Sequence, residues 1–174
     1  MKKDKKSLTL AITGHRDMIE TKKLRDDVDN YLENIITNNL QSKIVLLSPL
    51  ADGADRFIAK LFLEKKKKYK QLSLIVPMPF EKKRYMEDFD SLSKKDFLNF
   101  LKLSDDTFKV STHTNDTAYR DVGIYVASNS NILLAIWDGI FNGKVGGTSD
   151  IVEYACDKNY EVVHFPCNRE MNQK

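Results

Sequence analysis

The chain has 174 residues, of which 41% are hydrophobic and 30% are charged, and a formal net charge of +3. This composition is typical of one globular domain that buries a core, and it excludes a disordered chain, a collagen-like repeat and a disulfide-rich miniprotein. No apolar run reaches the roughly 18 residues that cross a bilayer, so no membrane partner is expected. The basic excess lies in short lysine runs, typical of solvated helix ends, and nucleic acid is therefore not the expected partner.

Lysines precede the first apolar run, 8–12, as they do in a secretory signal peptide. The run is too short, however, and it continues into the polar segment 14–17 without a cleavage pattern. We therefore interpret it as the first strand of a cytoplasmic protein. The two cysteines, Cys156 and Cys167, match no metal-ligand spacing, and we expect them to be reduced.

Short apolar runs alternate along the chain with segments in which apolar residues recur every three or four positions. The runs predict buried strands and the periodic segments predict amphipathic helices. Strands are predicted at 7–13, 43–48, 71–76 (stopped by Pro77 and Pro79), 108–111, 131–137 and 161–165. Helices are predicted between Leu24 and Ile36, from Gly53 to about Lys67, once or twice within 81–103, at 119–129 and at 148–158. The polar tail after Pro166 is expected to be frayed.

Continuous apolar strands joined by amphipathic helices are typical of a parallel sheet that is covered on both faces. With right-handed crossovers, the predicted fold class is α/β, a three-layer Rossmann-like fold with a mostly parallel sheet. The chain shows no internal repeat and no linker, so one domain is predicted, with its core at about 7–166. A homo-oligomer is left open, because related folds often form dimers.

Ligands of such sheets bind beyond the carboxyl ends of the strands, so the segments that follow the strands are the candidate site. They are GHRD at 14–17, SPLADGADR at 48–56, PMPF at 77–80 and, after the 131–137 strand, Asp138 and the glycine-rich GKVGGT at 143–148. Glycine, proline and charged residues gather in all four. We expect the four segments to meet at one edge of the sheet.

The glycine-rich loop is the most informative of these segments. Gly146 and Gly147 at a helix start let backbone N–H groups approach an anion, and the helix N-terminus adds partial positive charge. Thr148 can offer a hydroxyl to a phosphate, and Lys144 a cation. The alternative is a flexible loop in which Thr148 caps the helix. The order of a P-loop, G-x-x-x-x-G-K-[ST], is absent.

A second helix start lies at Gly53, where Asp52 can cap the helix and Asp55 lies in the first turn, favoured by the helix dipole. In the functional interpretation, Gly53 lets a ligand approach the backbone while Asp55 or Arg56 reaches it.

In GHRD, Gly14 ends the strand tightly, and His15 and Arg16 project over the edge of the sheet. There Arg16 can bind a phosphate with two hydrogen bonds. The alternative is a solvated basic turn.

The sequence contains three histidines, His15, His113 and His164, in separate segments without the spacing of a zinc site. We therefore predict no metal, and no cofactor. The G-x-S-x-G pattern is absent and neither cysteine follows a predicted strand of the site, so nucleophilic serine or cysteine catalysis is not expected.

The segments ITGHR (12–16), SPLADGADR (48–56) and GGT (146–148) together resemble the SLOG superfamily, Rossmann-like domains that include the LOG phosphoribohydrolases, DprA and the N-terminal domains of TRPM channels. The resemblance extends from Leu8 to about Phe165, and it is greatest to bacterial members with the GHR, LADGADR and GGT segments. It implies binding of a nucleotide or a nucleotide-derived signal, with a role in sensing.

One departure concerns catalysis. LOG enzymes carry P-G-G-x-G-T-x-x-E with a catalytic glutamate, whereas this chain reads VGGTSDIVE and places Ile151 at the glutamate position when aligned on Thr148. Asp150 and Glu153 lie roughly 150° around the helix from the inward stripe of Ile151. The carboxylate of a hydrolase is therefore missing from its usual place.

Three functions follow, in order of preference. In the first, a nucleotide or a derivative binds at the carboxyl ends of the strands. Its phosphate contacts Gly146, Gly147 and Thr148 near Gly53, Arg16 and Arg56 supply charge, Asp55 or Asp138 holds a ribose hydroxyl or the base, and 77–80, including Pro79, walls the base. The second is hydrolysis of a nucleotide N-glycosidic bond with Asp55, Asp150 or Glu153 as the acid. The third is binding of single-stranded DNA, although the chain shows no clear basic-aromatic groove.

Overall fold

Within residues 6–170, which the computed structural model describes, six strands form one sheet, and every pair of neighbouring strands is parallel. The strands are β1 (Ser7–Gly14), β2 (Lys43–Leu47), β3 (Leu72–Met78), β4 (Asp106–Lys109), β5 (Ile132–Trp137) and β6 (Glu161–Pro166). The helices are α1 (Lys22–Thr37), α2 (Ala54–Lys66), α3 (Lys82–Met86), α4 (Ser91–Leu103), α5 (Thr117–Ser128) and α6 (Thr148–Asp157). The α/β, Rossmann-like fold that the sequence predicts is confirmed.

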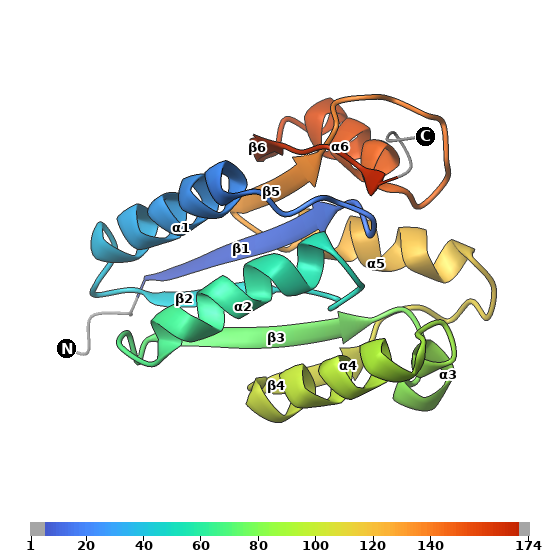
Figure 1. Ribbon diagram of the computed structural model, residues 1–174, viewed down its shortest axis with the longest axis horizontal. Helices are drawn as coiled ribbons and strands as arrows, with labels where there is room; N and C mark the ends of the chain where they lie inside the picture. Colours follow the sequence, from blue (N-terminus) through green and yellow to red (C-terminus); the bar gives the residue numbers. More distant parts are fainter. Residues whose placement is uncertain (1–5, 171–174) are drawn as a thin grey trace.

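The strand order is β4-β3-β2-β1-β5-β6 (Figure 1). Successive strands from β1 to β4 extend outward on one side of β1, and the chain then returns to place β5 on the other side. The loops that follow β1 and β5 therefore leave the sheet in opposite directions. A crevice forms at such a reversal of strand order, beyond the carboxyl ends of the strands.

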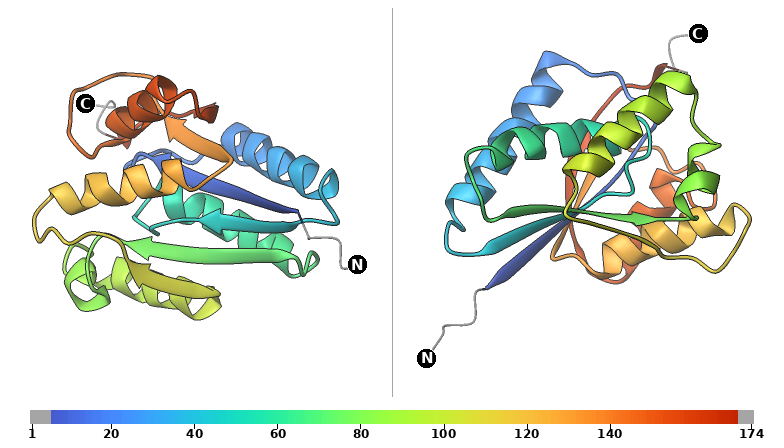
Figure 2. Two further views of the ribbon diagram at one scale, coloured as in Figure 1. Left: turned by 180° about the vertical axis from the view of Figure 1, so that it is seen from behind. Right: turned by 90° about the horizontal axis from the view of Figure 1, so that it is seen from below.

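Helices cover both faces of the sheet: α1, α2 and α4 lie on one face, and α5 and α6 on the other (Figure 2). Because side chains alternate along a strand, Leu10 and Ile12 of β1 belong to the core under the first group, and Ala11 packs with the second. Strands that are buried on both faces explain the continuous apolar runs of the sequence. No helix in the described part of the chain is long and apolar enough to cross a membrane.

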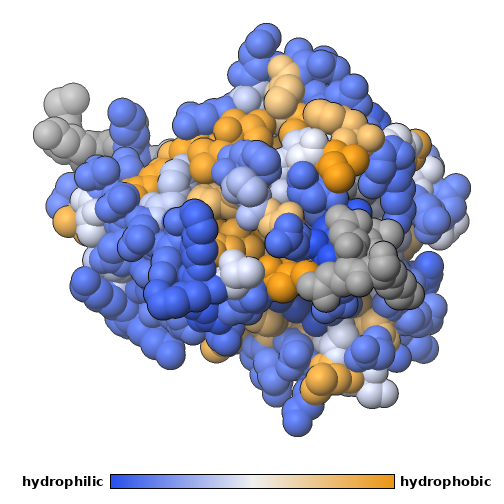
Figure 3. All heavy atoms as spheres, turned by 45° about the horizontal axis from the view of Figure 1, so that its top comes forward, coloured by the Kyte–Doolittle hydropathy of each residue, from blue (hydrophilic) through white to orange (hydrophobic). Residues whose placement is uncertain are grey.

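Hydrophilic side chains cover most of the face that Figure 3 shows, with apolar residues between them in small groups. Three exposed large apolar side chains belong to the loop between β5 and α6: Ile140, Phe141 and Val145. The rings of Phe141 and Trp137 form a T-shaped pair, with their centroids 5.1 Å apart. This loop is therefore held at its start by aromatic packing and carries apolar groups on its outside.

β3 is longer than predicted: it continues through Pro77 and ends at Met78. Proline has no N–H group to donate. The N–H of this position would face β2, however, and the pairing of β2 with β3 ends at Leu47 and Ile75. The last hydrogen bond between the two strands runs from the Ser48 N–H to the Ile75 carbonyl oxygen at 3.1 Å, so the pairing stops where proline lacks a donor.

β4 begins two residues earlier than predicted, at Asp106. Its start is anchored by Asp105: the Leu74 N–H donates to Asp105 Oδ2 at 2.8 Å, and the Asp105 N–H donates to the Leu74 carbonyl oxygen at 2.8 Å. The partner of this contact lies 31 residues away in the sequence, so local pattern carried no sign of it.

The prediction that the tail frays after Pro166 is wrong for residues 167–170. The Cys167 N–H donates to the Trp137 carbonyl oxygen at 3.1 Å, the Ile19 N–H to that of Asn168 at 2.9 Å, and the Glu170 N–H to that of Asp17 at 2.9 Å. The first bond holds the tail to the end of β5, and the other two hold it against the loop that follows β1. Polar composition suggested fraying, but backbone partners some 150 residues away decide the outcome.

Candidate functional site

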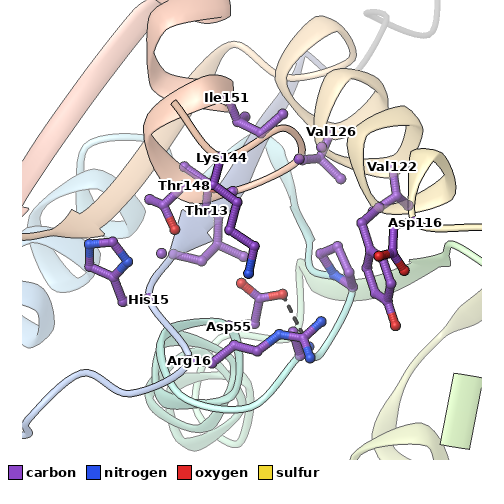
Figure 4. Close-up of a pocket in the computed structure, with 18 of the residues that line it drawn as sticks. Thr13, His15, Arg16, Asp55, Asp116, Val122, Val126, Lys144, Thr148 and Ile151 are labelled. Atoms are coloured by element: carbon purple, nitrogen blue, oxygen red, sulfur yellow. Dashed lines mark hydrogen bonds between the residues drawn. The ribbon is translucent and has the colours of Figure 1, made fainter. Parts of the chain in front are cut away.

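A cavity of about 560 Å³ opens at the carboxyl ends of β1, β2 and β5 (Figure 4). The loops after β1 and β2, the loop between β5 and α6, and helices α3 and α5 all contribute to its lining. In Figure 4, Lys144 extends into the cavity toward Asp55 and Arg16, with His15 and Thr148 on one side and Asp116 on the other. Three of the four strand-end segments singled out in the sequence, 14–17, 48–56 and 143–148, therefore meet, whereas the fourth, 77–80, contributes no residue to the lining.

The loop after β1 brings His15 and Arg16 to the cavity. Gly14 lets this loop pass close to α2, because a Cβ at position 14 would lie 2.7 Å from the Ile136 carbonyl oxygen and would overlap Ala54. The His15 N–H continues the sheet pairing by donating to the Ile136 carbonyl oxygen at 3.1 Å. Arg16 is exposed, and its guanidinium carbon lies 5.2 Å from the centroid of the Tyr119 ring, a cation–π contact.

Gly53 brings α2 against this loop. It has φ +77°, and a Cβ there would lie 2.5 Å from the His15 carbonyl oxygen. The next residue, Ala54, donates its N–H to the same oxygen at 3.1 Å. The close approach at Gly53 is therefore to the protein's own backbone, and Gly53 is outside the cavity lining.

The prediction that Asp52 caps α2 is wrong. Gly53 occupies the N-cap position, and no side chain accepts a hydrogen bond there. Asp52 instead pairs with Arg56 at 2.8 Å and accepts a hydrogen bond from Ser93 Oγ. The buried Arg56 also donates from Nε to the Leu50 carbonyl oxygen at 2.9 Å, so its guanidinium joins α2 to α4 and does not face the cavity.

Asp55 lies at the floor of the cavity and is 6% exposed. One of its carboxylate oxygens accepts a hydrogen bond from the Ala51 N–H at 3.1 Å. Burial raises the pKa of Asp55 to about 7, against the lowering effects of the Ala51 N–H and of the charges on Arg16 and Arg56. Near neutral pH this carboxyl group is therefore present in both forms, as a donor and as an acceptor of hydrogen bonds.

The loop before α6 uses its glycine amides internally. The Gly146 N–H donates to Asp150 Oδ2 at 2.7 Å, and the Gly147 N–H donates to the Lys144 carbonyl oxygen at 3.0 Å. Arg120 Nε also pairs with Asp150 Oδ2 at 2.9 Å. Among the described residues, no acceptor faces the N–H groups of Thr148 and Ser149, the first two residues of α6. These amides are the donors that a bound anion would meet.

Thr148 does not cap α6, since Gly147 holds the N-cap position. The prediction that Thr148 caps the helix, which belonged to the flexible-loop alternative, is therefore wrong. Asn142 organises the loop instead: its Oδ1 accepts hydrogen bonds from the Lys144 N–H at 3.1 Å and from Ser149 Oγ at 3.0 Å. The Thr148 hydroxyl is left for the cavity, which Thr148 lines.

His15 is 5% exposed, and its Nε2 lies 3.0 Å from Asp138 Oδ1. Burial acts to raise the pKa of Asp138, but hydrogen bonds from His15 and the Ile140 N–H, with Arg169 nearby, hold that pKa below its ordinary value. Asp138 itself is outside the cavity lining. It therefore orients the His15 ring from behind and does not itself face the cavity.

The far wall of the cavity is formed at α3 and at the start of α5, and the sequence analysis did not identify it. Tyr119 of α5 and Asp116, the residue before this helix, line it together with Tyr85 of α3 and Asp88, two residues after that helix. The Tyr119 hydroxyl donates to Asp88, and the buried Tyr85 hydroxyl donates to the Pro49 carbonyl oxygen at 3.1 Å. Burial raises the pKa of Tyr85, so it stays a neutral donor. These four residues lie seven to ten positions beyond the ends of β3 and β4, outside the strand-end segments that the rule selects.

The predicted site residues divide into two groups. Eight line the cavity: Gly14, His15, Arg16, Asp55, Lys144, Gly146, Gly147 and Thr148. Six are outside the lining: Gly53, Arg56, Pro79, Asp138, Asp150 and Glu153. Of the three candidate acids, Asp150 is held by Arg120 and Glu153 is exposed on α6, so Asp55 is the one that faces the cavity.

No protein-family model matches the sequence, and no curated protein is similar enough to it to count as a match. Within residues 6–170, no three histidine, cysteine or acidic side chains gather in the geometry of a metal site. The chemistry of the cavity therefore has to be argued from its own residues.

Proposed function

We propose that the cavity binds a nucleotide or a nucleotide-derived ligand. The observation that carries the proposal is the convergence of Arg16, Lys144 and the N-terminus of α6 on one cavity, beyond the carboxyl ends of β1 and β5. A volume of about 560 Å³ is within the range of small-molecule and cofactor sites. The resemblance of 12–16, 48–56 and 146–148 to SLOG domains supports the same conclusion.

The phosphate end of the ligand is placed at α6. There the first amides of α6 and the Thr148 hydroxyl offer hydrogen-bond donors, the helix dipole favours negative charge, and Lys144 lines the same cavity. Arg16 reaches the same space from the opposite loop. Because Arg16 is exposed and rests on Tyr119 through a single cation–π contact, it is free to turn toward a phosphate.

The sugar and base are placed toward Asp55 and the wall formed by α5. Asp55, with its pKa raised by burial to about 7, accepts or donates a hydrogen bond to a ribose hydroxyl at neutral pH. The half-buried Tyr119 ring offers a face on which a base stacks. Pro79, which the sequence suggested as a wall for the base, is outside the lining, and Tyr119 takes that role in this proposal.

A thermal-shift panel tests the proposal. Mononucleotides, dinucleotides, cyclic nucleotides and ADP-ribose derivatives are each added in excess to the full chain, and at least one raises the melting temperature in a concentration-dependent way. Arg16→Gln removes most of that shift, whereas Arg25→Gln, at an exposed arginine of α1, retains it. The proposal fails if no member of the panel shifts the melting temperature.

Cleavage of a nucleotide N-glycosidic bond is a second candidate, favoured by Asp55 alone. A carboxyl group with a pKa near 7 at the cavity floor is suited to protonate a departing base. Recovery of intact ligand after incubation supports binding alone, and release of free base that Asp55→Asn abolishes supports the hydrolase. Single-stranded DNA would instead bind with an affinity that falls steeply with salt and that mononucleotides do not compete.

A further inference from the structure

The residues after β6 return to the cavity from the opposite end of the chain. Residues 168–170 run antiparallel to 17–19, with Met18 and Arg169 as a bridge pair. Two backbone hydrogen bonds join the segments, from the Ile19 N–H to Asn168 and from the Glu170 N–H to Asp17. The loop that carries His15 and Arg16 is therefore clamped by the C-terminal segment.

Arg169 adds a side chain to this clamp. Its Nε donates to Asp17 Oδ1 at 2.8 Å, and its Nη1 lies 3.9 Å from Asp138 Oδ2. Arg169 also lines the cavity, and its side chain is 18% exposed. The Arg169 guanidinium thus connects Asp17, in the loop after β1, to Asp138, which follows β5.

Asp138 also forms a hydrogen bond with His15. The His15 Nε2–H donates to Asp138 Oδ1, while the Ile140 N–H donates to the same oxygen at 3.1 Å. Because an ionised carboxylate only accepts hydrogen bonds, the neutral imidazole carries its proton on Nε2. The His15 Nδ1 then has a free lone pair, and among residues 6–170 no donor faces it. Figure 4 shows the ring beside Thr148 at the edge of the cavity.

We infer that Arg169 brings the C-terminal segment into the wall of the ligand site, and that it is a positioning residue which, through Asp17 and Asp138, holds His15 with Nδ1 available to accept a hydrogen bond from the ligand. The group that such a nitrogen recognises is a hydroxyl or an N–H, such as a sugar hydroxyl. The role in ligand binding rests on the proposed function, whereas the clamp and the tautomer are properties of the free protein.

The first test needs no ligand. Amide hydrogen exchange of the full chain measures Ile19 and Glu170, and both are protected in the natural protein. Arg169→Gln raises their exchange rates at least tenfold, Arg169→Lys restores part of the protection, and Arg25→Gln, an arginine on α1, changes neither. Exchange of Ile19 and Glu170 at the rate of an unstructured peptide in the natural protein overturns the inference.

The second test reads the tautomer of His15 from long-range ¹H–¹⁵N spectra of the ring at pH 8, with His113→Gln and His164→Gln to assign the three histidines. The natural protein shows the form protonated at Nε2, and Asp138→Asn converts it to a mixture. A ring protonated at Nδ1 in the natural protein overturns the inference.

The third test separates this inference from the proposed function. Titration calorimetry uses the nucleotide that gives the largest thermal shift, and Arg169→Gln weakens its binding about tenfold, the loss expected when a charged group no longer positions its partners. Equal affinity in both proteins overturns the role in ligand binding and leaves the proposed function standing. If no nucleotide binds, the proposed function and this role in binding fail together, while the clamp and the tautomer are decided by the first two tests.

Discussion

Gly53 packs so closely on the loop after β1 that a Cβ at position 53 would lie 2.5 Å from the carbonyl oxygen of His15. One atom of that contact would be the added Cβ and the other is a backbone oxygen, so neither can move away easily. The position of His15 and Arg16 at the cavity therefore depends on a residue that does not line it.

Gly53→Ala is expected to destabilise the protein by about 2–4 kcal/mol, because it adds both a steric overlap and a strained positive φ. Gly143 is the matched control, since it also has a positive φ, +70°, but a Cβ there meets nothing within 4 Å. Gly143→Ala should cost about 1 kcal/mol, from backbone strain alone. Urea unfolding measures both variants, and equal losses would contradict the packing argument.

Asp55 makes the stability of the fold depend on pH. Its pKa in the folded protein, about 7, is above its ordinary value of 3.8, so the folded state binds the proton more tightly than the unfolded state. This group therefore favours folding most below about pH 4, and its contribution is lost as the pH rises to about 7.

Asp55→Asn should remove that dependence. Relative to the natural protein, the variant gains stability between pH 4 and pH 7, by up to about 4 kcal/mol at the upper end. Urea unfolding at a series of pH values gives the difference between the two proteins, which cancels the contributions of other acids. Asp26→Asn, at an exposed acid of α1, serves as the control. A difference that does not change with pH would mean that folding does not raise the pKa of Asp55.

Asp150 is expected to hold the loop before α6 and to have no part in catalysis. Asp150→Ala removes the acceptor for the Gly146 N–H and the partner of Arg120, and should cost about 1–2 kcal/mol of stability. The Gly146 amide should then exchange its hydrogen faster. Glu153→Ala changes an exposed acid on the same helix and should leave both measurements unchanged. Faster exchange in both variants would point to general loosening of α6.

Lys144 and Arg16 should act on the ligand from opposite sides. Each of Lys144→Gln and Arg16→Gln is expected to weaken nucleotide binding about tenfold, the range of one hydrogen bond to a charged group. Neither should change the free energy of unfolding by more than about 0.5 kcal/mol, because both side chains are exposed. Lys23→Gln on α1 is the control for loss of charge. Weakening by all three variants alike would indicate non-specific attraction of an anion.

The elements were predictable because their signals are local. The apolar run at 131–137 predicts a buried strand without any tertiary information, and β5 covers Ile132–Trp137. The spacing of Leu24, Val28 and Leu32 predicts α1 in the same way, and all three side chains are buried. Parallel strands place their carboxyl ends at one edge, so the rule that ligands bind there found eight residues of the cavity.

Contacts between distant segments were not predictable. The polar composition of the tail predicted fraying, but Asn168 and Glu170 form backbone hydrogen bonds with the loop at 17–19. Gly53 was predicted to let a ligand approach, but the backbone of His15 occupies that space. Arg56 was predicted to bind a phosphate, but its guanidinium donates hydrogen bonds to Leu50 and Ser93.

By itself, the sequence determined the alternation of strands and helices, the parallel sheet and the edge at which polar residues gather, because hydrophobic periodicity and strand-end glycines act over a few residues. Only the tertiary structure decided which of those residues face the cavity, that Tyr119 of α5 and Arg169 of the tail join them, and that Asp55 has a raised pKa. Burial, charge pairing and backbone hydrogen bonds between segments more than 100 residues apart depend on the packed chain, and no local pattern encodes them.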